Sequence, residues 1–145
     1  MAGHALSLPL QLILFSLDVM SLPEIIAFEN RQKVVAIAQQ LLAGQIGVIG
    51  AARQIDSLRG DRVAVDEFDP DFVTFLAIDS ETDDLPVGTT RERWAADALA
   101  EKDVEIARCE ELYRTQALEA ASHLVARFAD EKRPESEHTL HAQDI

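Results

Sequence analysis

The fold is decided by residues 90–129, which read TRERWAADALAEKDVEIARCEELYRTQALEAASHLVARFA. Apolar side chains recur in this stretch at spacings of three, four and seven residues, which is the pattern of one face of an α-helix. At the usual rise per residue, such a helix is about 55 Å long. The predicted apolar stripe consists of Trp94, Leu99, Ile106, Cys109, Tyr113, Ala117, Ala120, Leu124 and Phe128.

The start of this long helix is predicted from Thr89-Thr90-Arg91-Glu92, a capping-box pattern. A helix of this length extends beyond a small domain unless it bends or pairs with a second copy of the chain. We therefore expect a possible homodimer, formed through the long helix or through the apolar amino end.

Two further helices are predicted in the first half of the chain. The segment Ser21-Leu22-Pro23-Glu24 has a capping-box pattern, so a helix is expected over residues 22–43, and Gly44 ends it in the left-handed conformation. A shorter helix is expected over residues 46–58, with Val48, Ile49, Ala52 and Ile55 on its apolar face and with Gly47 and Gly50 allowing close approach of a neighbour.

A third short helix is predicted after a loop over residues 59–68. Asp69-Pro70-Asp71 is a strong helix start, because Asp caps the first turn and Pro fits the first helical position. Phe72, Phe75 and Leu76 then line one side. Val73 and Ile78 would also fit a strand, but the sequence offers no partner strand. We predict an all-α fold, a small bundle of four to five helices with one long C-terminal helix, in a single domain over residues 21–129.

Both ends of the chain are predicted to lie outside this domain. Residues 1–20 form an apolar extension or helix, too short to span a bilayer and interrupted by Pro9 and Asp18. A secretory signal is disfavoured, because no Lys or Arg precedes the apolar run and no small-residue cleavage site follows it. The alternatives are an added helix, packed on the body or on a partner, and an upstream extension that precedes Met20. Residues 130–145 form a flexible polar tail.

Composition limits the function. The chain has 26 acidic and 13 basic residues and a net charge of −13. This charge repels nucleic acid and anionic membranes and attracts a basic protein, although acidity also serves solubility alone. A helix-turn-helix with Arg53, Arg59 and Arg62 is therefore disfavoured. The single cysteine, Cys109, is predicted to be a core residue in a cytoplasmic protein rather than a nucleophile.

Residues 78–88 read IDSETDDLPVG and contain the only chemistry that a helical core does not require. Asp79, Glu81 and Asp83 alternate like the first ligands of an EF-hand loop, but Asp84 stands where that loop needs Gly and Thr90 where it needs Glu. Four readings remain: caps for the flanking helices, a weaker Mg²⁺ or Ca²⁺ site, a carboxylate pair for acid–base chemistry, and a surface for a basic partner. No cofactor, catalytic residue or metal ligand is assigned. A metal site at His138 and His141, in the tail, is disfavoured.

This stretch, with Arg93-Trp94, Lys102-Asp103, Glu105-Ile106 and Tyr113 after it, resembles a group of small uncharacterised bacterial helical proteins. In them a similar acidic turn, ending in Leu-Pro-x-Gly, precedes a Trp-bearing helix. Residues 42–49 and Ala51-Ala52-Arg53 fit the same pattern. The resemblance implies a bacterial cytoplasmic protein and no particular activity. Small acidic immunity proteins, which neutralise bacterial toxins, are similar in size and charge only.

The sequence therefore favours a non-enzymatic acidic interaction protein, which binds a basic protein in the manner of an immunity protein or antitoxin. The alternative is a divalent-metal-binding or metal-dependent hydrolytic module that uses the carboxylates of residues 79–84. The residues predicted to contact the partner are Asp79, Glu81, Asp83, Asp84, Leu85, Pro86 and Trp94.

Overall fold

The computed structural model describes residues 2–134, with side chains from residue 22 onward. Between residues 2 and 134 there is no strand, and the all-α fold with a long C-terminal helix is confirmed. The elements are α1 (Ala2–Leu42), α2 (Val48–Asp56), the 3-10 helix η1 (Gly60–Arg62), α3 (Pro70–Glu81), the 3-10 helix η2 (Gly88–Arg93) and α4 (Ala96–Phe128).

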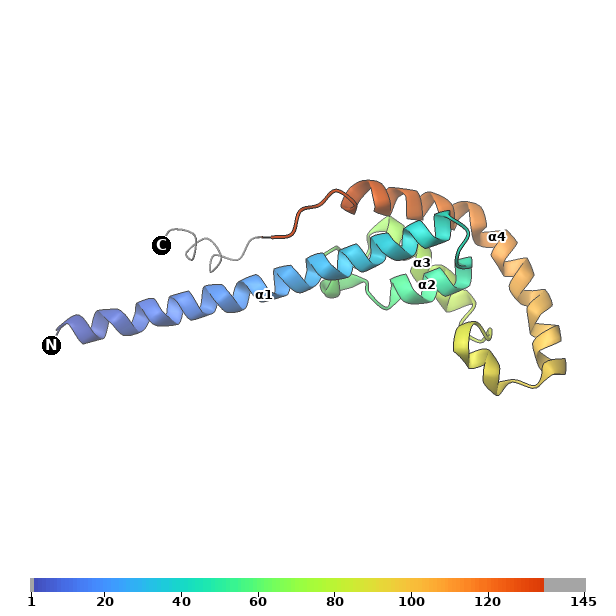
Figure 1. Ribbon diagram of the computed structural model, residues 1–145, viewed down its shortest axis with the longest axis horizontal. Helices are drawn as coiled ribbons and strands as arrows, with labels where there is room; N and C mark the ends of the chain where they lie inside the picture. Colours follow the sequence, from blue (N-terminus) through green and yellow to red (C-terminus); the bar gives the residue numbers. More distant parts are fainter. Residues whose placement is uncertain (1, 135–145) are drawn as a thin grey trace.

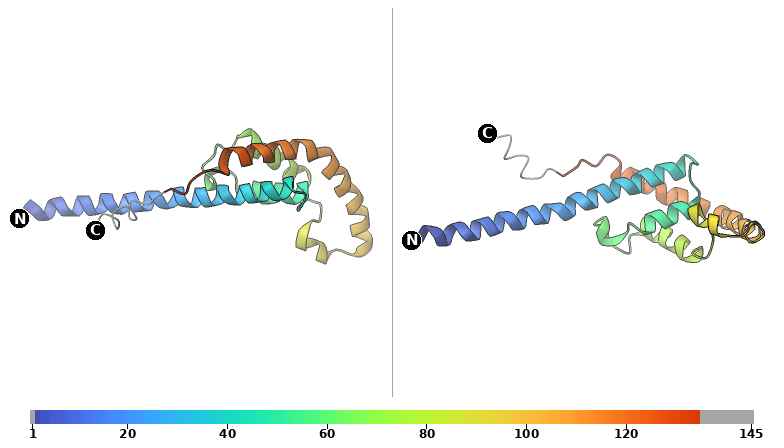
Figure 2. Two further views of the ribbon diagram at one scale, coloured as in Figure 1. Left: turned by 45° about the horizontal axis from the view of Figure 1, so that its top comes forward. Right: turned by 60° about the horizontal axis from the view of Figure 1, so that its bottom comes forward.

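Two long helices, α1 and α4, organise the molecule. Their carboxyl halves lie side by side, while α2 and α3 pack against each other and contact α4 (Figure 1). The amino half of α1 extends beyond the other helices in every view (Figure 2). The amino half of α4 curves away toward η2, so the long helix bends, which is one of the two alternatives that its length left open.

One hydrophobic core joins all four helices, and it confirms most of the predicted apolar stripes. Small alanines on α4 occupy its centre, which lets neighbouring helices approach closely. A smaller second cluster consists of Ile49, Leu85 and Cys109, so Cys109 is a core residue as predicted. The buried residues of the main core are Val34, Ile37, Ala38, Leu41, Val48, Ala51, Ala52, Ile55, Val63, Phe72, Phe75, Ile78, Ala117, Ala120, Ala121 and Leu124.

The turn between α1 and α2 depends on two glycines. Gly44 has a φ of +72°, which confirms the predicted left-handed end of α1. A Cβ on Gly47 would lie only 2.7 Å from Oε1 of Glu110 on α4, so the predicted close approach is also confirmed there. It is wrong for Gly50, because no heavy atom lies within 4 Å of the position that a Cβ would take.

The predicted start of α3 is confirmed. The Asp69 carboxylate accepts a hydrogen bond from the backbone N–H of Asp71 at 3.1 Å, and Pro70 is the first helical residue. The helix continues to Glu81, so the first half of the predicted acidic turn is its last turn.

The predicted start of the long helix is wrong. Residues 88–93 form η2 instead, and the Thr90 hydroxyl donates to the carbonyl of Val87 at 2.8 Å. α4 begins at Ala96 without a side-chain cap, so Trp94 precedes the helix. The physical reason is a tertiary contact: Arg91 donates to both carboxylate oxygens of Asp103, at 2.6 and 3.0 Å, and so holds η2 against the side of α4.

The predicted start of the first helix is also wrong. α1 is continuous from Ala2, so it does not begin at residue 22, and Pro23 lies inside it. The Leu-rich sequence before residue 21 has a high helix propensity, and the two prolines inside α1, Pro9 and Pro23, each remove one backbone donor without ending the helix. The Ser21 side chain, proposed as a cap, lies outside the described residues. The division of the chain near residue 20 stays a prediction.

The first residues of the predicted flexible tail contact α1. Arg31 donates to both carboxylate oxygens of Glu131, at 2.9 and 2.5 Å, and Arg133 lies 3.3 Å from the Glu29 carboxylate. The rest of the tail, with His138 and His141, lies outside the described residues.

Candidate functional site

The four predicted carboxylates lie at the carboxyl end of α3, and we call Asp79, Glu81, Asp83 and Asp84 the acidic corner. The first two are in the last turn of α3, and the other two follow it. Between them Thr82 is fully buried, and its hydroxyl donates to the carbonyl of Ile78 at 2.6 Å. The corner is therefore an ordered helix end rather than an open loop.

Arg53 of α2 caps this helix end from the side. One of its terminal nitrogens, Nη2, donates to the carbonyls of Thr82 and Leu85, at 2.6 Å in each case. Its Nε lies 3.7 Å from the Asp79 carboxylate. A cation at a helix C-terminus satisfies free carbonyls and opposes the negative end of the helix dipole. Arg53 thus holds the corner in shape, and it is the residue that the sequence analysis missed as part of the site.

The surroundings of Asp79 disfavour the ionised form of its carboxyl group. Its pKa is raised from an ordinary value of 3.8 to about 6, chiefly by burial and then by a hydrogen bond with the carboxyl of Asp56 and by the charge of Asp56. The charge of Arg53 lowers the pKa, and that of Asp83 raises it.

The other three carboxylates of the corner are exposed. Asp84 has one cation near it, the Lys102 ammonium at 3.6 Å, and Lys102 is also 3.6 Å from Glu105. Among residues 22–134, no Lys, Arg or His nitrogen lies within 4.0 Å of Glu81 or Asp83. The negative charge of the corner is therefore only partly neutralised within the described part of the chain.

The three apolar residues predicted to contact a partner have different positions. Leu85 is only 2% exposed and Pro86 is buried as well, so both belong to the packing of the helix end. Trp94 lies between η2 and α4 with 37% of its surface exposed. Of the three, only Trp94 presents apolar surface to a partner.

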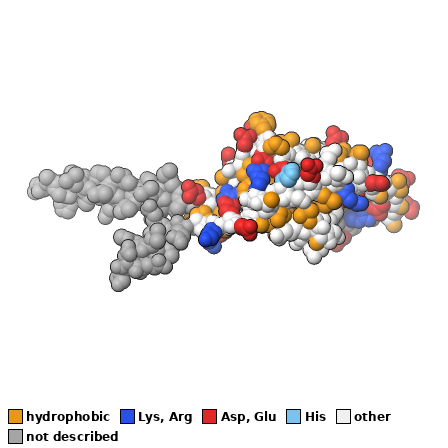
Figure 3. All heavy atoms as spheres, turned by 90° about the horizontal axis from the view of Figure 1, so that it is seen from above, with side chains coloured by type: hydrophobic (Ala, Val, Ile, Leu, Met, Phe, Trp, Pro, Cys, Tyr) orange, Lys and Arg blue, Asp and Glu red, His pale blue; other side chains and the backbone are white. Residues whose placement is uncertain are grey.

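The amino end of α3 carries a second charged cluster that the sequence did not reveal. Arg127 of α4 donates to both oxygens of Asp69, at 2.9 and 2.7 Å, and to Asp71 at 2.9 Å. The hydrogen bond from Arg127 is the main reason that the pKa of Asp69 is lower than usual. Nδ1 of His123 lies 2.9 Å from the Asp71 carboxylate. Figure 3 shows a face of the molecule on which acidic, basic and histidine side chains lie next to one another.

The other arginines considered for nucleic acid also contact their own chain. Arg59 pairs with Asp56 at 2.9 Å, and Arg62 donates to the carbonyl of Ser57 at 2.5 Å. Over the described residues, no group of three or more His, Cys, Asp or Glu side chains is arranged to hold a metal ion. None of the described helical stretches has an apolar run that would cross a bilayer.

The comparisons with known proteins add no family to this description. The predicted resemblance to small bacterial helical proteins therefore stays a prediction, and the function has to be argued from the geometry of the chain. The chain matches no protein-family model, and comparison with curated proteins and with solved structures finds no significant similarity.

Proposed function

We propose that the chain is a non-enzymatic binding protein whose acidic corner receives a basic protein partner. One observation carries the proposal: the carboxylates of the corner are crowded on an ordered helix end with too few cations around them. The raised pKa of Asp79 is the electrostatic sign of this excess, because burial and neighbouring carboxylates disfavour its charge. A partner's Lys or Arg side chain would relieve it.

The corner is suited to charge-assisted contacts. Glu81, Asp83 and Asp84 are exposed and project from a rigid helix end that Arg53 holds in place. Carboxylates in such an arrangement accept hydrogen bonds from guanidinium or ammonium groups without reorganising the backbone. Trp94 contributes the apolar part of the contact in this proposal, and Leu85 and Pro86 support the helix end from within.

Long-range attraction adds to these contacts. A net charge of −13 on 145 residues attracts a basic protein from a distance and raises the association rate at low salt. An immunity or antitoxin-like inhibitor of a basic toxin is the kind of protein that this charge fits. The buried free thiol of Cys109 agrees with a cytoplasmic location, which is part of the proposal.

The proposal is tested by separating local charge from net charge. Two variants of equal net charge are compared in partner capture from the host extract and in association kinetics with the captured protein. The first neutralises the corner, with Asp79→Asn, Glu81→Gln, Asp83→Asn and Asp84→Asn. The second neutralises four exposed acids elsewhere, with Asp61→Asn, Glu67→Gln, Glu111→Gln and Glu119→Gln.

We expect the corner variant to lose capture and the control variant to retain most of it. For the wild type, the association rate should fall steeply between about 50 and 300 mM salt, because screening shortens the reach of the charges. Equal losses in the two variants would mean that only net charge matters, and would overturn the acidic corner as the binding surface.

No arrangement among the described residues favours the metal-dependent alternative. Calorimetric titration with Mg²⁺, Ca²⁺ and Mn²⁺ tests it directly, and we expect no heat of binding. A binding heat that disappears in the corner variant would restore the alternative.

A homodimer is the second partner that we propose, through the outer face of α4. Val104 and Leu112 are 74% and 64% exposed on that helix, so a second copy of the chain could cover their apolar surface. Sedimentation of the wild type and of a Val104→Lys, Leu112→Lys variant tests this. A monomer at every concentration in both would overturn it.

A further inference from the structure

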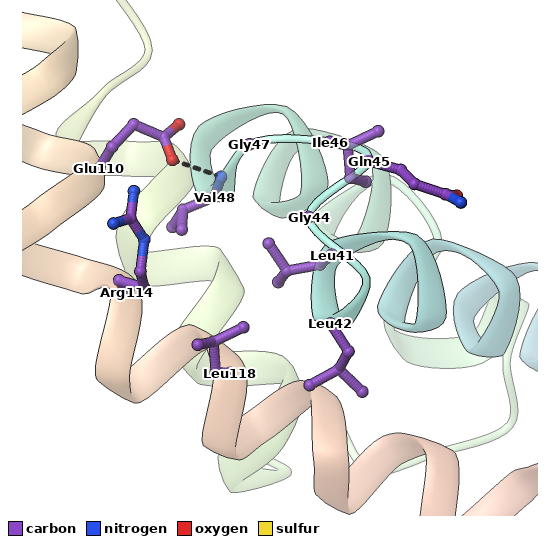
Figure 4. A pocket seen from close by; sticks show the side chains of 10 residues that line it. All are labelled: Leu41, Leu42, Gly44, Gln45, Ile46, Gly47, Val48, Glu110, Arg114 and Leu118. Atoms are coloured by element: carbon purple, nitrogen blue, oxygen red, sulfur yellow. Dashed lines mark hydrogen bonds between the residues drawn. The ribbon is translucent and has the colours of Figure 1, made fainter.

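A pocket of about 430 Å³ lies between the end of α1, the turn to α2 and the middle of α4. Its volume is within the range of about 300–1,000 Å³ that small-molecule sites occupy. Leu41, Leu42 and Leu118 form its apolar side, and Figure 4 shows them between the two long helices. Leu42 is 42% exposed, so part of this apolar surface is open to solvent.

The polar side of the pocket contains one acid and one base. The acid, Glu110, is already engaged: its carboxylate accepts hydrogen bonds from the backbone N–H groups of Val48 at 2.6 Å and Ile49 at 3.0 Å. It therefore caps the amino end of α2 and is not free to hold a cationic ligand.

The cationic side chain, Arg114, has no carboxylate partner in the described part of the chain. Among residues 22–134, no carboxylate oxygen lies within 4.0 Å of its guanidinium nitrogens. Figure 4 shows Arg114 rising from α4 at the edge of the pocket, one turn from Glu110. Of the basic side chains, Arg114 is the one that lines this pocket.

We propose that this pocket binds a small apolar monocarboxylate. The apolar body lies against Leu41, Leu42 and Leu118, and the carboxylate accepts hydrogen bonds from Arg114. An ammonium group of the same shape is disfavoured because it meets the like charge of the guanidinium, and an alcohol offers neither a negative charge nor a second acceptor oxygen. This proposal does not depend on the acidic corner, because none of the four corner carboxylates lines the pocket.

The test uses octanoate as the probe, with 1-octanol and octylamine as matched controls of different charge. Methyl resonances of Leu41, Leu42, Val48 and Leu118 report whether each probe enters the pocket, and their shifts give the Kd at pH 7. We expect octanoate to shift these methyls with a Kd of the order of 1 mM. Octanol and octylamine should bind at least about fivefold more weakly.

Two substitutions on α4, each of which removes one positive charge, test whether Arg114 itself binds the carboxylate. Arg114→Gln removes the proposed contact, and Arg108→Gln is the control, since Arg108 is exposed on the same helix and does not line the pocket. We expect Arg114→Gln to weaken octanoate binding about fivefold to tenfold, with binding of octanol unchanged, because only the charge-assisted bond is lost. Arg108→Gln should leave both unchanged.

Three results would overturn the proposal. The first is no shift of the pocket methyls at about 10 mM octanoate, a concentration that would fill any site of the expected affinity. The second is octanol binding as tightly as octanoate. The third is an equal effect of the two substitutions, which would assign the attraction to the charge of the helix surface as a whole.

Discussion

At its two ends, α3 carries carboxylates of the same kind in opposite surroundings. At the amino end, Asp69 and Asp71 face the positive end of the helix dipole and are paired with Arg127. At the carboxyl end, Asp79 faces the negative end of the dipole, with Asp56 beside it. Accordingly, the pKa of Asp69 is lowered and that of Asp79 is raised.

The comparison separates carboxylates whose charge stabilises the fold from carboxylates whose charge is not fully paired, and the proposed binding surface uses the second kind. Carboxylates at the amino end stabilise the helix when ionised, so their charge is used inside the molecule. Ionised Asp79 is a cost to the fold at neutral pH, because burial and its neighbours disfavour the charge. An excess of this kind has to be offset, and Arg53 does so only in part. We regard the remaining excess as the basis for binding a cationic partner.

The largest expected effect comes from removing the cap at the carboxyl end. Arg53→Met should lower the free energy of unfolding at pH 7 by about 2–3 kcal/mol, since two carbonyls lose a charged donor. The pKa of Asp79 should rise further, because Arg53 is the cation that lowers it. Urea unfolding and an NMR titration of Asp79 measure the two effects. A loss no greater than that of the exposed control Arg93→Met would contradict the capping role.

The matched change at the amino end should have a smaller effect. Arg127→Met is expected to cost about 1–2 kcal/mol at pH 7, because the ion pairs are partly exposed and solvent screens them. The pKa of Asp69 is lowered in the folded wild type, so this stabilisation is present above pH 3.8 and is lost as the pH falls through the folded-state pKa. In acid-unfolding curves, the free energies of unfolding of the wild type and the variant should therefore converge as the pH falls. A difference that stays constant with pH would argue against stabilisation by the ionised Asp69.

The third substitution, Asp79→Asn, should raise the free energy of unfolding at pH 7 rather than lower it. The pKa of Asp79 rises from 3.8 to about 6 on folding, so the wild type is stabilised at low pH and loses stability as the pH rises through 6. At about 1.4 kcal/mol per pKa unit the upper limit is about 3 kcal/mol, and screening and the lost contact with Arg53 reduce it to about 1. Asp79→Asn should thus be more stable than the wild type at pH 7.

The pH dependence of this gain distinguishes it from a general effect of substitution. Below pH 3.8 the wild-type carboxyl is protonated in both states, so the advantage of Asp79→Asn should disappear. Thermal unfolding at pH 3.5 and pH 7 measures it, with Asp61→Asn as control, since Asp61 is exposed and is not among the groups that shift the pKa of Asp79. A destabilised variant at pH 7 would show that Asp79 is needed as an ionised partner of Arg53.

The smallest effect is expected from the exposed histidine of the amino end. The His123 side chain is 54% exposed, so its contact with Asp71 is worth little in water. His123→Gln should change the free energy of unfolding by less than about 0.5 kcal/mol at pH 7. A larger loss in urea unfolding would mean that the amino-end cluster acts as a cooperative network.

Local patterns in the sequence predicted the elements well where each residue's neighbours along the chain decide the outcome. The periodicity of residues 96–128 identified α4, and Asp69-Pro70 identified the start of α3. Two helix starts were predicted wrongly because other forces were stronger than a capping pattern. Arg91 binds Asp103 across η2, and the Leu-rich segment continues α1 through Pro23.

Of the candidate site, the sequence predicted the negative charge but not the positions of the apolar residues or the contacts that hold the site in place. The acidity of residues 79–84 is visible in the sequence, but Leu85 proved to be buried and Trp94 to lie outside the helix. Nor did any local signal indicate that Arg53 would cap the end of α3 or that Glu110 would cap the start of α2. These partners are 29 and 62 residues apart in the sequence, respectively, and become neighbours only when the helices pack.

That this protein is helical, acidic and built on one long amphipathic helix could be read from its residues alone, because hydrophobic periodicity and helix propensity act over a few residues. Which carboxylates are neutralised depends on the packing of the helices, because packing brings each carboxylate to its partners. Asp69 meets Arg127 across 58 residues of sequence, while Asp79 meets Asp56 as well as Arg53. The energy of a charge depends on the burial and the neighbours that packing gives it, and these are properties of the folded chain.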